Sequence, residues 1–405
     1  MSLEQARHKD PTPGPAWEVF LAFLKLGLTS FGGPVAHVGY FRLELVETRK
    51  WVTDLQFGQL LAICQFLPGP ASSQLGFSLG LIRAGWKGAL AAFLAFTTPS
   101  AMLLVAFAAF LPSLDGPLGT AAIHGLKIVA FAVVAHGVLG MGRRLCSDAR
   151  RASIAILAAA AVLAASSSLV QLLVVVGGAV AGIWLCRDAQ PSEDQDLGLG
   201  YGPRVGWTCL ILFAVLLVGL PLLAHHGPGE LAVADAFYRA GAMVFGGGHV
   251  VLPLLEQSTV APGWLTQDQF LAGYGAAQAI PGPMFSFAAY LGFVISTGAG
   301  GFSGAGIALL TIFLPGFLLV AGVLPLWRRI ATGKLAARAI AGVGAAVVGL
   351  LAAALYDPIF VSAINSPIDA AIGLLGFLGL ATRRTSAWVV VIGCVLASLA
   401  ITLLP

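Results

Sequence analysis

The sequence predicts an all-α polytopic membrane protein. Two inverted-topology repeats of about six helical segments each, with helices broken by Pro-Gly-Pro, flank one connecting helix. Three observations predict this fold. Hydrophobic residues form 58% of the chain and charged residues only 10%, whereas a soluble domain carries about 25% charged residues. One distinctive stretch of sequence occurs twice, and lysines and arginines are distributed oppositely in the two halves.

The duplicated stretch begins with Phe-Gly-Gly and ends with Pro-Gly-Pro. The first triplet lies at 31–33 and again at 245–247, and the second lies at 68–70 and again at 281–283. The offset is 214 positions for the first triplet (245 − 31) and 213 for the second (281 − 68). Matching residues between the triplets are Trp51 with Trp264, Phe57 with Phe270, and Gln65 with Gln278. In so apolar a chain, this duplication is typical of membrane proteins built from two repeats.

Apolar segments follow in the same order in both halves. In the first repeat, 17–186, they lie at 17–33, 57–82, 88–112, 119–141, 152–168 and 170–186. In the second repeat, 231–405, they lie at 231–248, 268–298, 302–327, 336–356, 367–382 and 386–404. A linker at 187–230 contains the connecting segment 207–224, and the polar residues 1–16 are expected to form a cytoplasmic tail. Because equivalent positions are seven segments apart, an odd number, the repeats should cross the membrane in opposite directions.

The positions of lysine and arginine support this inversion, since basic loops tend to stay in the cytoplasm. Loops that are basic only in the first repeat are 83–87 and 143–151, opposite 297–303 and 357–369. Loops that are basic only in the second repeat are 328–338 and 383–384, opposite 112–120 and 166–171. This pattern predicts a cytoplasmic N-terminus and an external C-terminus.

One loop disagrees with this pattern. The stretch 42–50 should lie outside, at the opposite end from 83–87, yet it contains Arg42, Arg49 and Lys50. It also contains Glu44 and Glu47. An interfacial or re-entrant position for this loop is left open.

Both Pro-Gly-Pro triplets interrupt apolar runs and predict broken helices, because proline removes a backbone donor and glycine adopts unusual dihedral angles. The ends of a broken helix expose unpaired N–H groups that suit an anion, and bare backbone at membrane depth must be buried or line a cavity. Candidate binding residues are therefore Pro68, Gly69, Pro70, Pro281, Gly282 and Pro283, with Gln65, Gln278, Ser72, Ser73 and Ser286 beside them. The alternative is that the triplets only kink two helices for packing.

The Phe-Gly-Gly triplets supply further candidates in the glycine pairs Gly32 with Gly33 and Gly246 with Gly247. Consecutive glycines allow close approach to a ligand or, equally, to another helix. His37 and His249 follow these glycines and could donate to an anion or carry a proton. A single histidine is nevertheless more often structural.

Two cations also occupy equivalent positions. Lys25 and Arg239 are 214 residues apart (239 − 25), each inside an apolar segment, where a charged side chain is costly and usually functional. Snorkelling toward the membrane surface is the alternative. Asp235 precedes Arg239 by four residues, and an ion pair between them would weaken the case for Arg239 as a ligand.

The sequence lacks the motifs of common enzymes and metal sites. The five cysteines have no Cys-x-x-Cys spacing, and neither a nucleotide-binding loop nor a zinc-binding helix motif is present. We therefore expect no enzyme activity, no cofactor, no metal and no nucleic-acid partner. The oligomeric state is open, with a homodimer as one option.

The joint pattern of residues 31–37, 42–51 and 65–74, with the second copy of both triplets, resembles the chromate ion transporter (CHR) family in its long, two-domain bacterial form. The resemblance covers essentially the whole chain. It implies a multi-pass protein of the bacterial inner membrane that exports chromate and confers chromate resistance, with sulfate as a competitor. The residues alone indicate an inverted-repeat secondary transporter for an oxyanion. The alternatives are transport of sulfate or another oxyanion, and a membrane-embedded enzyme or scaffold.

Overall fold

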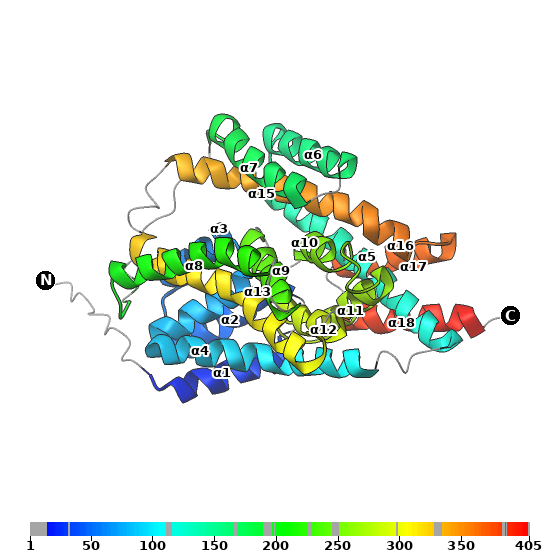
Figure 1. Ribbon diagram of the computed structural model, residues 1–405, viewed down its shortest axis with the longest axis horizontal. Helices are drawn as coiled ribbons and strands as arrows, with labels where there is room; N and C mark the ends of the chain where they lie inside the picture. The colour runs from blue at the N-terminus through cyan, green and yellow to red at the C-terminus, as the bar shows by residue number, and fades with distance from the viewer. Residues whose placement is uncertain are drawn as a thin grey trace, which may run out of the picture.

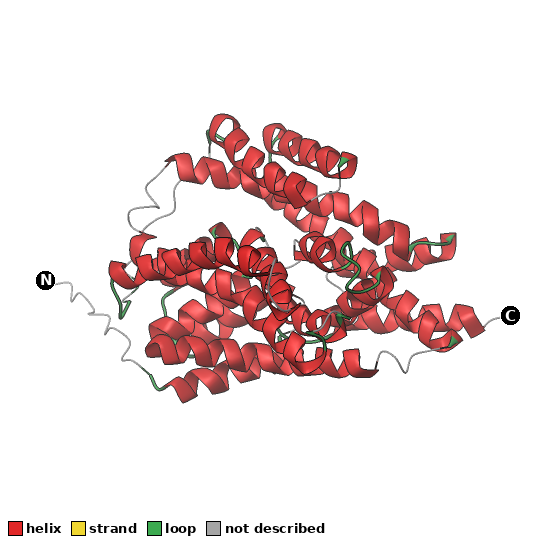
Figure 2. Ribbon diagram, in the orientation of Figure 1, coloured by secondary structure: helices red, strands yellow, loops and turns green. Residues whose placement is uncertain are grey.

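The computed structural model describes the 405-residue chain except residues 1–13, 31–32, 111–115, 166–167, 189–196, 198, 225–228, 245–250, 297–298, 328–333, 383–384, 386 and 404–405. Every described element is a helix (Figure 2). Helices long and apolar enough to cross a membrane lie at 71–110, 117–145, 203–224, 301–326 and 337–363. The chain is an all-α polytopic membrane protein, as predicted.

The helices of the first half come in an order that the second half repeats. The first half contains α1 (Ala16–Thr29), α2 (Gly33–Phe41), the π-helix η1 (Arg42–Thr48), α3 (Asp54–Phe66), α4 (Ala71–Phe110), α5 (Pro117–Leu145), α6 (Ala149–Ala164) and α7 (Ser168–Leu185). The connecting helix is α8 (Pro203–Ala224). The second half contains α9 (Gly229–Met243), α10 (Val251–Thr259), α11 (Gln267–Ala279), η4 (Met284–Ser286), α12 (Phe287–Val294), α13 (Gly301–Val323), η5 (Leu324–Leu326), α15 (Lys334–Ala354), η6 (Leu355–Phe360), α16 (Val361–Ala363), α17 (Pro367–Ala381) and α18 (Ala387–Leu403).

Helix α4 is two helices that fold back on each other. Gly85 has φ +62° and divides residues 71–83 from residues 86–110. A Cβ atom on Gly80 would lie 2.5 Å from the Gly88 carbonyl oxygen, although eight residues of straight helix span about 12 Å. In the second half, a Cβ atom on Gly292 would likewise lie 2.2 Å from the Gly304 carbonyl oxygen, which brings α12 against α13.

The short helices α3 and α11 begin in the same way. Thr53 accepts a hydrogen bond from the Gln56 backbone N–H, and the Gln56 side chain accepts one from the Thr53 backbone N–H. Thr266 and Gln269, each 213 positions later (266 − 53 and 269 − 56), form the same capping box. Because a capping box satisfies otherwise unpaired N–H groups at a helix start, both copies place a helix end at the same point.

The π-helix η1 accounts for the change in offset between the two halves. The offset falls from 214 at Phe31 to 213 at Trp51, and η1 lies between these two residues. A π-helix accommodates one more residue per turn than an α-helix does. The extra residue of the first half is therefore absorbed within the helix.

The two halves interlock through their long helices. Helix α15 of the second half packs on α6 and α7, and α5 of the first half packs on α11, α17 and α18. The first of these groups forms the upper layer of Figure 1. A Cβ atom on Gly125 would lie 2.7 Å from the Val395 Cα atom, so α5 and α18 touch along their backbones. The main hydrophobic cluster among the described residues contains buried side chains of both halves.

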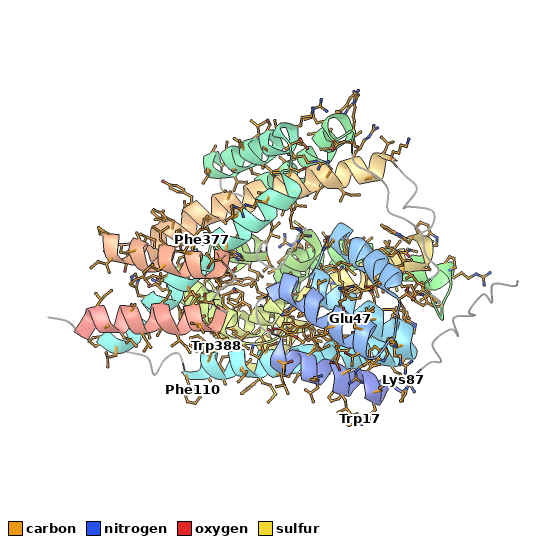
Figure 3. All side chains as sticks on the ribbon, turned by 180° about the vertical axis from the view of Figure 1, so that it is seen from behind. Trp17, Glu47, Lys87, Phe110, Phe377 and Trp388 are labelled. Carbon is orange, nitrogen blue, oxygen red and sulfur yellow. The ribbon has the colours of Figure 1, made fainter. Side chains whose placement is uncertain are left out.

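The basic loop 42–50 does not lie opposite the loop 83–87, and that expectation is wrong. The Glu18 carboxylate accepts hydrogen bonds from Arg83 at 3.0 Å and from the Trp51 indole at 3.1 Å, and it lies 4.0 Å from Arg49. The labelled residues Glu47 and Lys87 lie in the same half of Figure 3. The reason is that α1 runs away from the end that holds Glu18, and α2 with η1 runs back toward it. The chain therefore returns to its starting end before Trp51.

Candidate functional site

The two Pro-Gly-Pro turns and the ends of α1 and α9 meet in reciprocal pairs. The Gly69 backbone N–H donates to the Val244 carbonyl at 2.6 Å, and the Gly282 N–H donates to the Ser30 carbonyl at 3.0 Å. Val244 and Ser30 each immediately precede a Phe-Gly-Gly triplet. Each Pro-Gly-Pro turn therefore contacts the end of the first helix of the other half. We call this region the crossing: Ser30, His37, 68–74, 96–100, Val244, 281–286 and Gly316.

Both central glycines of the Pro-Gly-Pro turns have conformations that other residues avoid. Gly69 has φ +125° and Gly282 has φ +109°. A Cβ atom on Gly69 would lie 2.9 Å from the Gly316 Cα atom, and one on Gly282 would lie 2.9 Å from the Ser100 hydroxyl oxygen. Dihedral angle and available space thus both require glycine.

Polar side chains of the first half bridge the elements of the crossing. His37 is fully buried, with Nε2 3.2 Å from the Ser30 carbonyl oxygen and Nδ1 3.5 Å from the Ser72 hydroxyl. The Gln74 side-chain amide donates to the Pro68 and Gly316 carbonyls, both at 3.0 Å. Gln74 thereby ties the first Pro-Gly-Pro turn to α13 of the second half.

Several buried polar atoms on these elements have no hydrogen-bond partner among the described residues. They are Ser30 Oγ, Ser73 Oγ, Thr97 Oγ1 and Gln74 Oε1. A buried polar group left unpaired costs about 1–3 kcal/mol, so such a cluster is unusual in a closed core. Three of the four atoms are hydroxyls, which can donate to an oxyanion.

The other predicted residues divide between this region and its surroundings. Ser286 donates to the Pro283 carbonyl at 2.6 Å, and the buried Gln278 donates to Met284 Sδ at 3.7 Å. Pro70 and Pro283 are buried, Pro68 and Pro281 are partly buried, and Gln65 is exposed. Gly33 begins α2. Gly32, Gly246, Gly247 and His249 lie outside the described residues.

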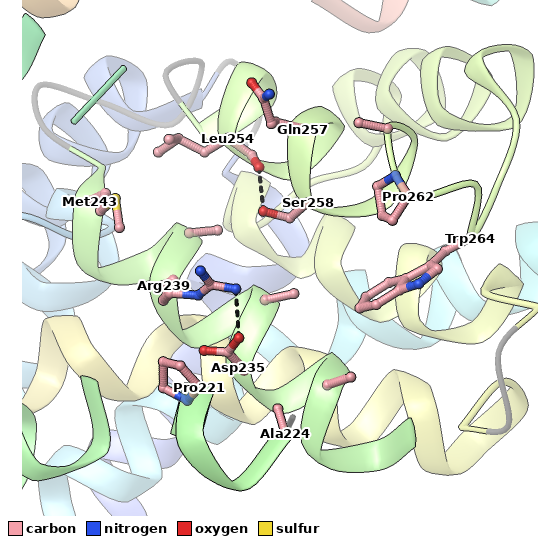
Figure 4. Close-up of a pocket in the computed structure, with 14 residues that line it drawn as sticks. Pro221, Ala224, Asp235, Arg239, Met243, Leu254, Gln257, Ser258, Pro262 and Trp264 are labelled. Carbon is pink, nitrogen blue, oxygen red and sulfur yellow. Dashed lines mark hydrogen bonds and ion pairs between the residues drawn. The ribbon is translucent and has the colours of Figure 1, made fainter. Parts of the chain in front are cut away.

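Lys25 and Arg239 are each paired with a carboxylate. The Lys25 ammonium lies 2.7 Å from Glu44, and the lysine side chain is 61% exposed. Arg239 lies 2.6 Å from Asp235 and is 45% exposed. The ion pair anticipated for Arg239 is thus present. Arg239 also lines a pocket of about 590 Å³ between α8, α9 and α10 (Figure 4).

Sequence reasoning missed Ser30, Gln74, Thr97 and Ser100 as parts of the crossing. A signal exists for Ser100, since α4 and α13 each contain one internal proline, Pro99 and Pro315, 216 positions apart (315 − 99). Ser100 and Gly316 directly follow these prolines and contact the opposite Pro-Gly-Pro glycine.

Both halves of the chain are similar to known proteins. The chromate transporter family model matches residues 17–183 and 231–399. The chromate transport protein of Pseudomonas aeruginosa is 28% identical over 88% of this chain and 84% of its own length. The probable chromate transport protein of Synechococcus elongatus is 29% identical over 82% of this chain and 81% of its own length. The chromate transport protein of Cupriavidus metallidurans is 26% identical over 94% and 92%, respectively. No solved structure matches the chain significantly. With both of its halves matched, the chain belongs to the chromate transporter family.

Proposed function

We propose that this protein is a secondary transporter that exports chromate across the bacterial inner membrane and so confers chromate resistance. The observation that carries the proposal is the reciprocal pairing of helix breaks, Gly69 with Val244 and Gly282 with Ser30. Two broken helices facing each other at the interface of two repeats are the usual binding-site architecture of secondary transporters. Three named relatives are chromate transport proteins or probable ones.

We further propose that the two halves are inverted relative to each other. Between the last short helix before Gly85, residues 71–83, and the first helix of the second half, α9, the chain passes through residues 86–110, α5, α6, α7 and α8. This is an odd number of helices, and it stays odd if the short pair α6 and α7 does not cross fully. An odd number of crossings turns the second half upside down.

The revised place of loop 42–50 supports a cytoplasmic N-terminus. Arg49 and Arg83 both lie beside Glu18, so the loop that had violated the charge rule shares an end with the basic loop 83–87. With this change, every basic loop named above is cytoplasmic under the positive-inside rule. Accessibility of a Glu47→Cys variant to an impermeant thiol reagent tests this, and labelling from outside intact cells would refute it.

The chemistry of the crossing suits a dianion that must bind and leave again. The hydroxyls of Ser30, Ser73 and Thr97 have no partner among the described residues, and the helix starts after both Pro-Gly-Pro turns present backbone N–H groups. Hydrogen bonds from neutral donors hold an anion less firmly than a buried ion pair does. An inside-negative potential drives a dianion outward with about 4.6 kcal/mol per 100 mV, because each charge contributes about 2.3 kcal/mol.

Radiolabelled chromate uptake into inverted membrane vesicles tests the proposal. We expect uptake that requires the protein and is stimulated by an inside-positive potential in such vesicles. Labelled sulfate in a parallel arm decides between chromate and a general oxyanion substrate. Absence of uptake for both anions, with the protein present in the membrane, would overturn the proposal.

A further inference from the structure

The pocket between α8, α9 and α10 lies outside the crossing and has its own polar lining. It holds about 590 Å³ and is bordered by the end of α8, by α9, and by the stretch from Leu254 to Trp264. Asp235 and Arg239 are the charged residues of this lining, and Gln257 and Ser258 are polar neighbours. Figure 4 shows Asp235 and Arg239 at the left of the pocket, Ser258 above them and Trp264 at the right.

The equivalent place in the first half is filled by ion pairs. There Glu18 lies beside Arg49 and Arg83, and Glu44 pairs with Lys25 and Arg49, across the gap between α1 and η1. Lys25 corresponds to Arg239, which is also a cation, but three of the other ion-pair residues have neutral counterparts in the second half. Glu18 corresponds to Ala232 (232 − 18 = 214), Arg49 corresponds to Pro262 (262 − 49 = 213), and Glu44 corresponds to Gln257 or Ser258. All of these replacements line the pocket. The pocket therefore lies where the second half lacks the ion pairs that occupy the equivalent place in the first half.

One ion pair remains in the pocket, and its geometry is incomplete. The Arg239 Nη2 atom donates to Asp235 Oδ2 at 2.6 Å. The Asp235 side chain is 8% exposed, and its Oδ1 atom is buried without a hydrogen-bond partner among the described residues. A buried carboxylate oxygen without a hydrogen-bond partner is costly while the group is charged. The Arg239 side chain, 45% exposed, keeps guanidinium N–H groups available for the planar, two-pronged recognition of an oxyanion.

We propose that this pocket is a second binding site for a tetrahedral oxyanion. Arg239 binds the anion, and the Asp235 carboxylate competes with the anion for Arg239. Binding of the anion is therefore accompanied by protonation of Asp235. The anion class rests on the proposed transport function, and with the proposed inverted topology the site lies at the outer face. With Asp235 ionised, the pair has no net charge to attract a dianion, and the carboxylate itself repels the dianion at short range. A proton on Asp235 removes that charge and frees Arg239.

Other charged groups near Asp235 are few. Among the described elements, α8, α10 and α13 make the main contacts with α9. Helix α13 has no charged residue, α8 has only Arg204 in its first turn, at the opposite end from the pocket, and α10 contributes Glu256. Helix α9 itself adds Glu230 in its first turn. Among the residues that line the pocket, Asp235 alone can carry the proton.

A cysteine placed in the pocket reports occupancy directly. In a Ser258→Cys variant of the full chain in detergent, we measure the rate of labelling with a neutral thiol reagent. Four of the native cysteines are buried and Cys146 is half-buried, and the parent chain provides the background. Sulfate is the probe, because chromate oxidises thiols. We expect sulfate to slow labelling of the introduced cysteine about tenfold, from its charge-assisted hydrogen bonds to Arg239, and to act at lower concentration in acid than in alkali.

Three variants in this background decide the assignment. Arg239→Gln should abolish the protection, and Asp235→Asn should keep it while removing its dependence on pH. Lys87→Gln removes an exposed cation of the other end of the protein and should change nothing. Each variant is first checked for an unchanged elution volume and melting temperature.

The proposal fails if sulfate gives no protection, if Arg239→Gln retains it, or if Asp235→Asn retains the pH dependence. Protection by added anionic phospholipid but not by sulfate would also overturn it, since the ligand would then be a lipid headgroup. This outcome is separate from the transport proposal. If vesicles take up chromate but sulfate does not slow labelling of the introduced cysteine, only the second site is contradicted. If vesicles take up no chromate, the transport proposal is contradicted whatever the cysteine labelling shows.

Discussion

Replacing Gly69 by alanine should damage both the fold and transport. Gly69 has φ +125°, and this backbone conformation costs a residue with a Cβ atom about 1–3 kcal/mol. The new Cβ atom would also lie 2.9 Å from the Gly316 Cα atom, whereas ordinary contact begins at 3.4 Å, so the two backbones must separate by about 0.5 Å (3.4 − 2.9). We expect a stability loss of about 2–4 kcal/mol from strain and displacement together.

The measurement is thermal unfolding in detergent, followed by chromate uptake into vesicles at matched protein levels. Gly282→Ala is the partner variant, because Gly282 has φ +109° and its Cβ atom would lie 2.9 Å from the Ser100 hydroxyl. Gly39→Ala is the matched control, since Gly39 lies in α2 and an added methyl group there would have no neighbouring atom within 4 Å. It should gain up to about 1 kcal/mol from helix propensity. Unchanged melting and uptake in Gly69→Ala would refute the role given to the Pro-Gly-Pro turns.

Three further predictions concern the hydroxyls of the crossing, the Glu18 carboxylate and the cap of α6. Ser30→Ala with Ser73→Ala should raise the half-saturating chromate concentration about tenfold or more, as expected for lost hydrogen bonds to a charged ligand. Their hydroxyls have no partner among the described residues, so the melting temperature should not fall, and a fall would mean a structural role. Glu18→Gln should lower the melting temperature, since Glu18 joins Arg83 and Trp51, while Glu47→Gln, at an exposed pair, should not. Asp148 caps α6, and hydrogen bonds from the backbone N–H groups of Arg151 and Arg150 hold its pKa below the usual value. The stability that the Asp148 carboxylate contributes is therefore present above its ordinary pKa and is lost as pH falls through the lowered pKa. Asp148→Asn should remove this part of the acid sensitivity in melting curves, and an unchanged pH profile would contradict it.

The fold was largely predictable because it depends on patterns that repeat along the chain. Hydropathy identified the long helices, and the doubled triplets identified where helices break. The segments predicted at 57–82 and 268–298 are each two short helices around Pro-Gly-Pro, and hydropathy cannot separate them because both arms are apolar. Hydropathy also did not decide the course of α2 and η1, so the position of the loop 42–50 was left open between the outer face and a re-entrant return.

The candidate site was only partly predictable, because its contacts join residues far apart in the chain. Gly69 and Gly282 stood out through their repeated triplets, and His37 through its place beside Gly33. Gln74 did not stand out, since its bond to the Gly316 carbonyl spans 242 positions and no local pattern marks it. The ion partner of Lys25 was also hidden, because Glu44 lies on a different helix, whereas the pairing of Asp235 with Arg239 followed from helical spacing.

The interlocking of the two halves has a consequence for synthesis. Helix α5 packs on α18, and Ser398 near the end of the chain donates to the Ala121 carbonyl. The first half leaves the ribosome before its partners do, so the Gly69 turn waits for Val244 and Gly316, and α5 waits longer, for α18. Premature termination before Ala387 should therefore leave a membrane-inserted but open chain that cellular proteases remove, rather than a stable half-protein.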